Sequence, residues 1–175
     1  MVSNRENILL TGPPRSGKSA LIRRLAKELS DLGPKGFFIK ERVTGTRRVG
    51  FDIVAIDGST VKVNRRDAIF QNKTGRYDID HEALDDFIDN LSLTSAPLVI
   101  IDEIGKLEPT SRKLKTLITA LLSGETLLLA SIAKSGGGFI EAIKDREDST
   151  LYMLKRDNAE GVFRGIVSEV RSLLS

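Results

Sequence analysis

The chain has 175 residues, of which 40% are hydrophobic and 29% are charged, so its length and composition suit one globular domain with a buried core. It contains no cysteine, which excludes a disulfide framework and a thiolate metal site. It also carries no secretory leader and no apolar run of membrane-spanning length, so we expect a cytoplasmic protein without a membrane partner.

The net charge of +3 conceals an uneven distribution of charge along the chain. Residues 1–76 carry 16 Lys and Arg against 7 acidic residues, whereas residues 77–175 carry 11 against 17. The first part is therefore the part expected to face an anion. Its basic residues are scattered and have no aromatic residues interleaved with them, which argues against a groove for nucleic acid. We do not expect nucleic acid as a partner, and the sequence indicates no particular protein partner.

The first predicted element is a strand at Ile8–Leu10, followed by the octet GPPRSGKS and then by a stretch with helical periodicity. This order matches the phosphate-binding loop (P-loop) in both residues and context. Glycines let successive backbone N–H groups converge on phosphate oxygens, while the lysine adds positive charge and the final hydroxyl can replace a water around Mg²⁺. A plain glycine turn is the alternative, but it needs neither the lysine nor the hydroxyl. The predicted nucleotide-binding residues are Gly12, Pro13, Pro14, Arg15, Ser16, Gly17, Lys18 and Ser19.

Five strand-like runs alternate with helical periods, which is typical of a three-layer α/β fold in which helices flank a mostly parallel sheet. The runs are Ile8–Leu10, Gly36–Lys40, Leu98–Asp102, Thr126–Ile132 and Thr150–Leu154. Helices are expected directly after the octet and at Ile79–Leu91, Arg112–Leu122, Phe139–Lys144 and Glu160–Leu174.

Residues 41–77 interrupt this alternation, and we interpret them as a small insert within the single domain 1–175. Val49–Ile56 and Thr60–Val63, joined by an Asp-Gly turn, predict a β-hairpin. Arg47 and Arg48 lie at its start. Either could serve as an internal arginine finger, with Arg48 preferred because it adjoins the VGF segment, or both could belong to a solvated strand edge.

The apolar run Leu98–Ile101 ends in two acids, Asp102 and Glu103. Ligands of open α/β sheets bind at the carboxyl ends of the strands. Asp102 fits the acid that holds Mg²⁺ opposite Ser19, usually through a water. Glu103 can polarise or deprotonate the water that attacks the γ-phosphate, which favours hydrolysis over kinase chemistry. Two solvated acids at a helix cap or surface turn are the alternative.

Other residues have two open interpretations. Glu41 follows the second strand run at the ligand edge, and it either orients the water or the metal shell or is an ordinary solvated or paired carboxylate. Lys106 either contacts a phosphate or forms a surface salt bridge. The glycines Gly136–Gly138 form either a mobile loop over the nucleotide or the start of a helix. His81, the single histidine, is expected at the surface and has no predicted role.

With these segments the chain resembles a known family, the small thermophile-type nucleoside-triphosphatases, also called cancer-related nucleoside-triphosphatases, which are P-loop proteins with a catalytic Glu. The resemblance covers nearly the whole chain. It implies a RecA-like sheet and a slow, base-tolerant, Mg²⁺-dependent hydrolysis of ATP, GTP and related triphosphates to diphosphates. The family's Asn-Arg-Asp near the last helix reads Asn158, Ala159, Glu160 here, which leaves the role of Asn158 open. The matching segments are GPPRSGKS, GFFIKE, RRVGFDIVAIDG, GRYDID, VIIDEIGKLE and LLASIA.

Three functions remain open at this point. The first is hydrolysis of nucleoside triphosphates through Lys18, Ser19, Asp102 and Glu103. The second is a nucleotide or small-molecule kinase with an arginine-rich lid, and the third is a nucleotide-gated binding module whose insert forms the partner surface. The lid arginines would be Arg42, Arg47, Arg48, Arg65, Arg66 and Arg76.

Overall fold

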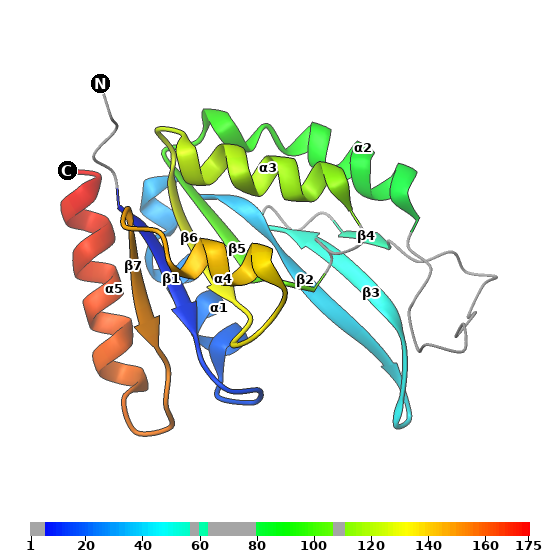
Figure 1. Ribbon diagram of the computed structural model, residues 1–175, viewed down its shortest axis with the longest axis horizontal. Coiled ribbons are helices and arrows are strands. Elements are labelled where there is room, and N and C mark those ends of the chain that lie inside the picture. Colours follow the sequence, from blue (N-terminus) through cyan, green and yellow to red (C-terminus); the bar gives the residue numbers. More distant parts are fainter. Residues whose placement is uncertain (1–5, 57–59, 63–79, 107–110) are drawn as a thin grey trace.

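The computed structural model describes residues 6–56, 60–62, 80–106 and 111–175, and Figure 1 shows their arrangement. The strands are β1 (Asn7–Thr11), β2 (Lys35–Thr44), β3 (Arg47–Ala55), β4 (Thr60–Lys62), β5 (Leu98–Ile104), β6 (Leu127–Ile132) and β7 (Ser149–Met153). The helices are α1 (Lys18–Glu28), α2 (His81–Leu91), α3 (Arg112–Ser123), α4 (Gly138–Lys144) and α5 (Ala159–Leu173), with short 3₁₀ turns at η1 (Ser30–Leu32) and η2 (Leu93–Ser95). The five predicted strand runs and all the predicted helices are present, with ends that differ by a few residues.

The strands form one seven-stranded sheet in the order β4-β3-β2-β5-β6-β1-β7. β2, β5, β6, β1 and β7 pair in parallel, whereas β3 and β4 join one edge in antiparallel pairs. The carboxyl ends of the five parallel strands therefore point to the same edge of the sheet. This confirms the mostly parallel α/β architecture.

Helices cover both faces of the sheet and divide the core in two (Figure 1). Side chains alternate along each central strand, so that in β1 Leu9 joins one core cluster while Ile8 and Leu10 join the other. The first cluster packs against α2, α3 and α4, and the second packs against α1 and α5. Because both faces are covered, the central strands are apolar along almost their whole length, as the sequence indicates.

The second strand is longer than predicted. β2 continues past Lys40 to Thr44, the chain turns at Gly45, and β2 pairs antiparallel with β3 from Phe37 to Thr44. β4 then pairs with β3, as the predicted hairpin requires, while its Asp-Gly turn lies outside the described residues. The sequence prediction ended β2 too early because charged residues follow Lys40. An antiparallel ribbon at a sheet edge accommodates them, since one of its faces can meet water.

Side-chain caps begin two of the helices. Asp80 accepts a hydrogen bond from the Ala83 N–H at the start of α2 (3.1 Å). Ser111 accepts one from the Leu114 N–H at the start of α3 (3.1 Å). Among the described residues no helix has both the length and the apolar character that a membrane span requires.

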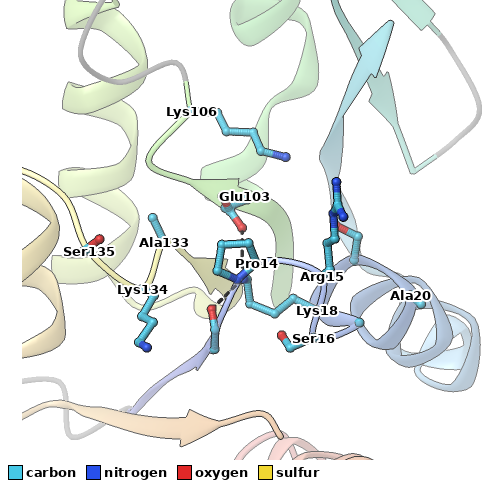
Figure 2. A pocket seen from close by; sticks show the side chains of 13 residues that line it. Pro14, Arg15, Ser16, Lys18, Ala20, Glu103, Lys106, Ala133, Lys134 and Ser135 are labelled. Atoms are coloured by element: carbon cyan, nitrogen blue, oxygen red, sulfur yellow. Dashed lines mark hydrogen bonds and ion pairs between the residues drawn. The ribbon is translucent and has the colours of Figure 1, made fainter. Parts of the chain in front are cut away.

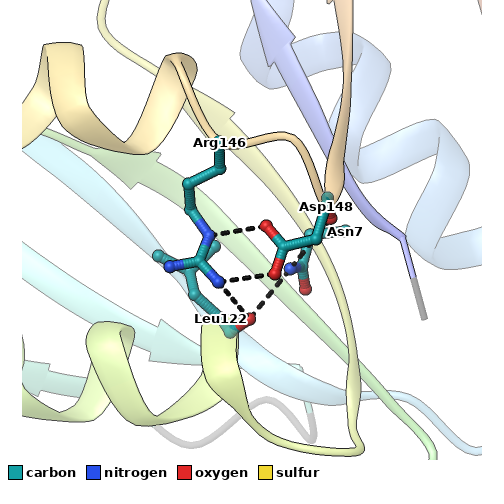
Figure 3. Close-up of polar contacts among 4 residues, drawn as sticks. All are labelled: Asn7, Leu122, Arg146 and Asp148. Carbon is teal, nitrogen blue, oxygen red and sulfur yellow. Dashed lines mark hydrogen bonds and ion pairs between the residues drawn. The ribbon is translucent and has the colours of Figure 1, made fainter. Parts of the chain in front are cut away.

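A polar cluster fixes the amino end of β1, at the edge of the sheet away from the P-loop (Figure 3). The Arg146 guanidinium donates to both oxygens of Asp148 (2.7 and 2.6 Å) and to the carbonyl oxygen of Leu122 (3.1 Å). The Asn7 amide donates to the same Leu122 carbonyl (3.1 Å). The cluster thus ties together the start of β1, the end of α3 and the loop before β7, and it holds the strand that leads into the P-loop.

Candidate nucleotide and phosphate site

The octet Gly12–Ser19 joins β1 to α1: residues 12–17 form the loop, and Lys18 and Ser19 are the first two residues of α1. Gly17 caps α1 with a φ of 94°, in the left-handed region that favours glycine. Within the loop, the Ser16 N–H donates to the carbonyl oxygen of Pro13 (3.2 Å). Because α1 begins directly after the loop, its free N–H groups and its positive dipole end are directed at the loop, where an anion can bind.

The loop forms one wall of a cavity of about 440 Å³, which lies within the range of roughly 300–1,000 Å³ that is usual for ligand pockets. Glu103 of β5 and residues that follow β5 and β6 form the opposite wall (Figure 2). Four of the described lining side chains are cationic and one is acidic, so the cavity suits an anionic ligand. The lining residues are Gly12, Pro14, Arg15, Ser16, Gly17, Lys18, Ser19, Ala20, Glu103, Lys106, Ala133, Lys134 and Ser135.

Lys18 and Glu103 point toward one another across this cavity (Figure 2). Lys18 Nζ lies 3.8 Å from Glu103 Oε2, and it donates to the carbonyl oxygen of Gly12 at 2.8 Å. Only 10% of the Lys18 side chain and 14% of the Glu103 side chain are exposed. The tip of β5 and the P-loop, which lie far apart in the sequence, therefore meet at one place.

Burial raises the pKa of the Glu103 carboxyl above its ordinary value. The positive charges of Lys106 and Lys18 lower this pKa and partly offset the burial, while the neighbouring Asp102 raises it. A carboxylate with a raised pKa is a stronger base, so its surroundings suit Glu103 for accepting a proton.

Asp102 is 1% exposed and lies on the face of β5 that packs against α1. Its Oδ1 accepts a hydrogen bond from the Ser131 hydroxyl of β6 (2.5 Å). Its Oδ2 is also buried and has no hydrogen-bond partner among the described residues. Such an orphan oxygen on a buried carboxylate indicates a place for a ligand or an ion.

Of the other candidate residues predicted from the sequence, some line the cavity and some do not. Lys106 lines the cavity. The sequence predicted that Glu41 lies where the second strand ends, but β2 continues beyond Glu41 and pairs it with Phe51 of β3. Glu41 is not among the cavity-lining residues. Arg47 and Arg48 lie in β3, but their side chains are outside the part of the chain that the structure describes.

Asn158 also lies outside the cavity wall and closes the turn between β7 and α5. Its side-chain amide donates to the carbonyl oxygen of Met153 (2.9 Å), and its Oδ1 accepts from the Lys155 N–H (2.7 Å). Both contacts are with the backbone of its own turn, which gives Asn158 a local structural role in this arrangement.

Two features were not predicted from the sequence: Ser131, which lies in β6, and the segment Ala133–Ser135, which follows β6. The backbone of this segment is held in place, since the Ala133 N–H donates to the carbonyl oxygen of Ile104 (3.0 Å) and Lys144 Nζ donates to that of Lys134 (2.6 Å). The available signal was its position directly after a buried parallel strand. The glycines next to it start α4, which begins at Gly138.

A glycine-rich loop that faces Glu103 across one cavity, at the carboxyl edge of a mostly parallel sheet, is typical of P-loop nucleotide-binding proteins. Comparison with known proteins narrows this class. The profile of the NTPase family matches residues 7–167, and the chain belongs to that family.

Individual relatives agree with this assignment. Nucleoside-triphosphatase THEP1 of Thermotoga maritima is 34% identical over 168 residues, which cover 94% of this chain and 95% of the relative. The human cancer-related nucleoside-triphosphatase is 29% identical over 184 residues, with 95% and 97% covered. The solution structure of a human cancer-related nucleoside triphosphatase matches with a TM-score of 0.76 at 27% identity, covering 95% of this chain and 98% of that one. The crystal structure of THEP1 from Aquifex aeolicus shares the fold, with a TM-score of 0.77 at 22% identity and 94% and 98% covered.

Proposed function

We propose that the chain binds a nucleoside triphosphate in this cavity and hydrolyses it to a nucleoside diphosphate and phosphate, with Mg²⁺ and without strict choice of base. The observation that carries the proposal is the 3.8 Å approach of Lys18 Nζ to Glu103 Oε2 across the cavity. A cation for the phosphates and a buried base for water then lie within one phosphate-sized space. Membership of the NTPase family and relatives named nucleoside-triphosphatases support the same reaction.

The phosphates would bind to the backbone N–H groups of the P-loop and to the amino end of α1. Lys18, which here donates to the carbonyl oxygen of Gly12, would turn toward the phosphates once they arrive. Arg15, Lys106 and Lys134 line the same space and would offset the remaining negative charge of the triphosphate.

The residues present fit a magnesium ion. The orphan Oδ2 of Asp102 is an oxygen acceptor, and the hydroxyl of Ser19 lines the cavity, which together give the hard oxygen donors that Mg²⁺ prefers. Asp102 would act through coordinated water and Ser19 directly. When bound, the ion neutralises charge on the β- and γ-phosphates.

Glu103 would act as the base. It would accept a proton from a water molecule whose oxygen attacks the γ-phosphorus, while the bond from that phosphorus to the β-γ bridging oxygen breaks and the diphosphate leaves with the electron pair. Its burial supports this role, because the raised pKa of the Glu103 carboxyl makes the carboxylate a better proton acceptor.

Turnover is expected to be slow, at about 10⁻² per second or below, because P-loop hydrolases without an arginine finger supplied by a partner run at such rates. Arg48, or else Arg47, stays a prediction for an internal finger. The cytoplasmic location likewise stays a prediction from sequence.

The test is release of inorganic phosphate by the purified protein from ATP, GTP, CTP and UTP, each with and without Mg²⁺. We expect release from all four with Mg²⁺, little without it, and a strong loss in the variant Lys18→Ala, which controls for contaminating phosphatases. Formation of the diphosphate only when an acceptor is added, with the phosphate transferred to that acceptor and not released, would favour the kinase. Nucleotide binding without any release would favour the gated binding module. Release unaffected by Lys18→Ala would exclude this cavity as the site.

A further inference from the structure

Two buried polar residues lie side by side on the central strands, on the face that packs against α1. By alternation Asp102 continues the series Leu98 and Ile100 in β5, and Ser131 continues Leu127 and Leu129 in β6. Those leucines and Ile100 pack in one cluster with α1, so the two polar residues end an otherwise apolar face at the carboxyl edge of the sheet.

Burying the pair Asp102 and Ser131 in the core costs free energy of folding. Ser131 is 0% exposed and Asp102 is 1% exposed. Burying a carboxylate costs free energy unless several donors satisfy it, and here one hydroxyl supplies the hydrogen bond that the structure describes. Apolar side chains of similar size would fill the same space without that cost, so the stability of the sheet does not account for the pair.

The two oxygens of Asp102 are in different situations. Oδ1 accepts a hydrogen bond from the Ser131 hydroxyl at 2.5 Å, and this bond restricts rotation of the carboxylate about the Cβ–Cγ bond. Oδ2 has no partner among the described residues, although it is buried. A carboxylate that is held by one oxygen presents the other in a defined direction, as hydrogen-bonded metal ligands do.

We infer that Ser131 is a positioning residue for Mg²⁺ binding: it holds Asp102 Oδ1 so that Oδ2 is presented to the ion and its water shell. The inference rests on the proposed function for the location of the ion. Residues that orient metal ligands in this way typically change metal affinity by roughly 10-fold to 100-fold when they are replaced. Ser131 touches neither nucleotide nor ion in this account and acts through Asp102 alone.

The experiment measures binding of a non-hydrolysable triphosphate analogue to the full chain while Mg²⁺ is titrated. In Ser131→Ala the Mg²⁺ concentration for half-maximal effect should rise by about 10-fold to 100-fold, while affinity for the analogue without Mg²⁺ stays unchanged. Ser131→Cys, which keeps the volume but has a weak donor, should behave like Ser131→Ala, and Ser131→Thr should restore binding within a few-fold. Once Asp102→Asn is introduced, Ser131→Ala should add no further loss.

Ser111→Ala is the matched control. Ser111 is also buried, at 2% exposed, and also forms a side-chain hydrogen bond, but it caps α3 rather than contacting Asp102. Its replacement should lower the thermal unfolding temperature and leave the Mg²⁺ titration unchanged.

Two outcomes would overturn the inference. One is a wild-type Mg²⁺ titration in both Ser131→Ala and Ser131→Cys, and the other is an equal loss of analogue binding with and without Mg²⁺. Because the measurement is of binding, a chain that releases no phosphate would refute the proposed hydrolysis and leave the role of Ser131 still measurable.

Discussion

Replacing Glu103 by glutamine separates the chemical step from nucleotide binding. Glutamine keeps the shape of the side chain but cannot accept a proton at neutral pH. A general base contributes about 10²-fold to 10⁴-fold to a rate, so turnover in Glu103→Gln should fall by that factor, equivalent to roughly 3–5 kcal/mol of transition-state free energy.

Nucleotide affinity should not fall with it. Glu103 Oε2 lies 3.8 Å from Lys18 Nζ, and both side chains are largely buried. Opposite charges at about 4 Å attract by about 1 kcal/mol in water and by about 4 kcal/mol at an effective dielectric constant near 20. Glu103→Gln removes this attraction and leaves Lys18 freer to bind phosphates, so the triphosphate should bind as well as before or somewhat more tightly. Burial also raises the pKa of Glu103, so a neutral side chain at this position should not lower the unfolding temperature.

The assay is single-turnover phosphate release together with equilibrium binding of ATP and Mg²⁺. In the wild type, the raised pKa of Glu103 predicts that the acid limb of the rate profile lies at a higher pH than for an ordinary carboxylate. Lys106→Ala should move this limb to still higher pH, because the positive charge of Lys106 lowers the pKa of Glu103 more than that of Lys18 does. A parallel loss of rate and affinity in Glu103→Gln, or an unchanged rate, would refute the role of Glu103 as base.

Three further predictions follow from single contacts. Lys18→Ala should weaken binding of Mg-ATP in an equilibrium titration, and normal binding would remove the proposed role of the loop lysine. Burial and the hydrogen bond to Glu169 raise the pKa of Tyr152 to about 12. An absorbance titration should therefore show a tyrosine that ionises near that pH, and this step should be absent in Tyr152→Phe. The stability that this group contributes should persist below about pH 10 and fall as the pH rises toward 12. Gly36→Ala should destabilise the fold by on the order of 3 kcal/mol or more in a urea titration, because a Cβ there would lie 1.8 Å from the carbonyl oxygen of Ile100 in β5. Gly161→Ala, in an open position on α5, should instead stabilise it by about 0.5–1 kcal/mol.

The parts of the site that are contiguous in sequence could be predicted from it. The glycines, the lysine and the hydroxyl of the octet Gly12–Ser19 are enough to predict a phosphate-binding loop. Asp102 and Glu103 stand out because two acids at the end of an apolar run are costly without a function. Such local patterns fix what a segment can bind, and the parallel arrangement of the strands brings the segments together.

Features that depend on distant partners could not be predicted. Ser131 is a lone serine in the run LLLASI, and its partner Asp102 is 29 residues away. Lys134 could not be predicted as a cavity residue, because only the folded position of the segment after β6 places it opposite the P-loop. Charged residues after Lys40 concealed the length of β2, because they become compatible with a strand only when β3 pairs beside it. In each case the missing information is which strands are neighbours.

The central claim is that the P-loop and the tip of β5 act on one bound triphosphate. A crystal structure with Mg²⁺ and a non-hydrolysable triphosphate tests it most directly. The account predicts the phosphates on the loop Gly12–Ser19, the ion between Ser19 and Asp102, and Glu103 facing the γ-phosphate across a water molecule. A triphosphate bound elsewhere, or one bound in the loop with Glu103 turned away from the γ-phosphate, would contradict it.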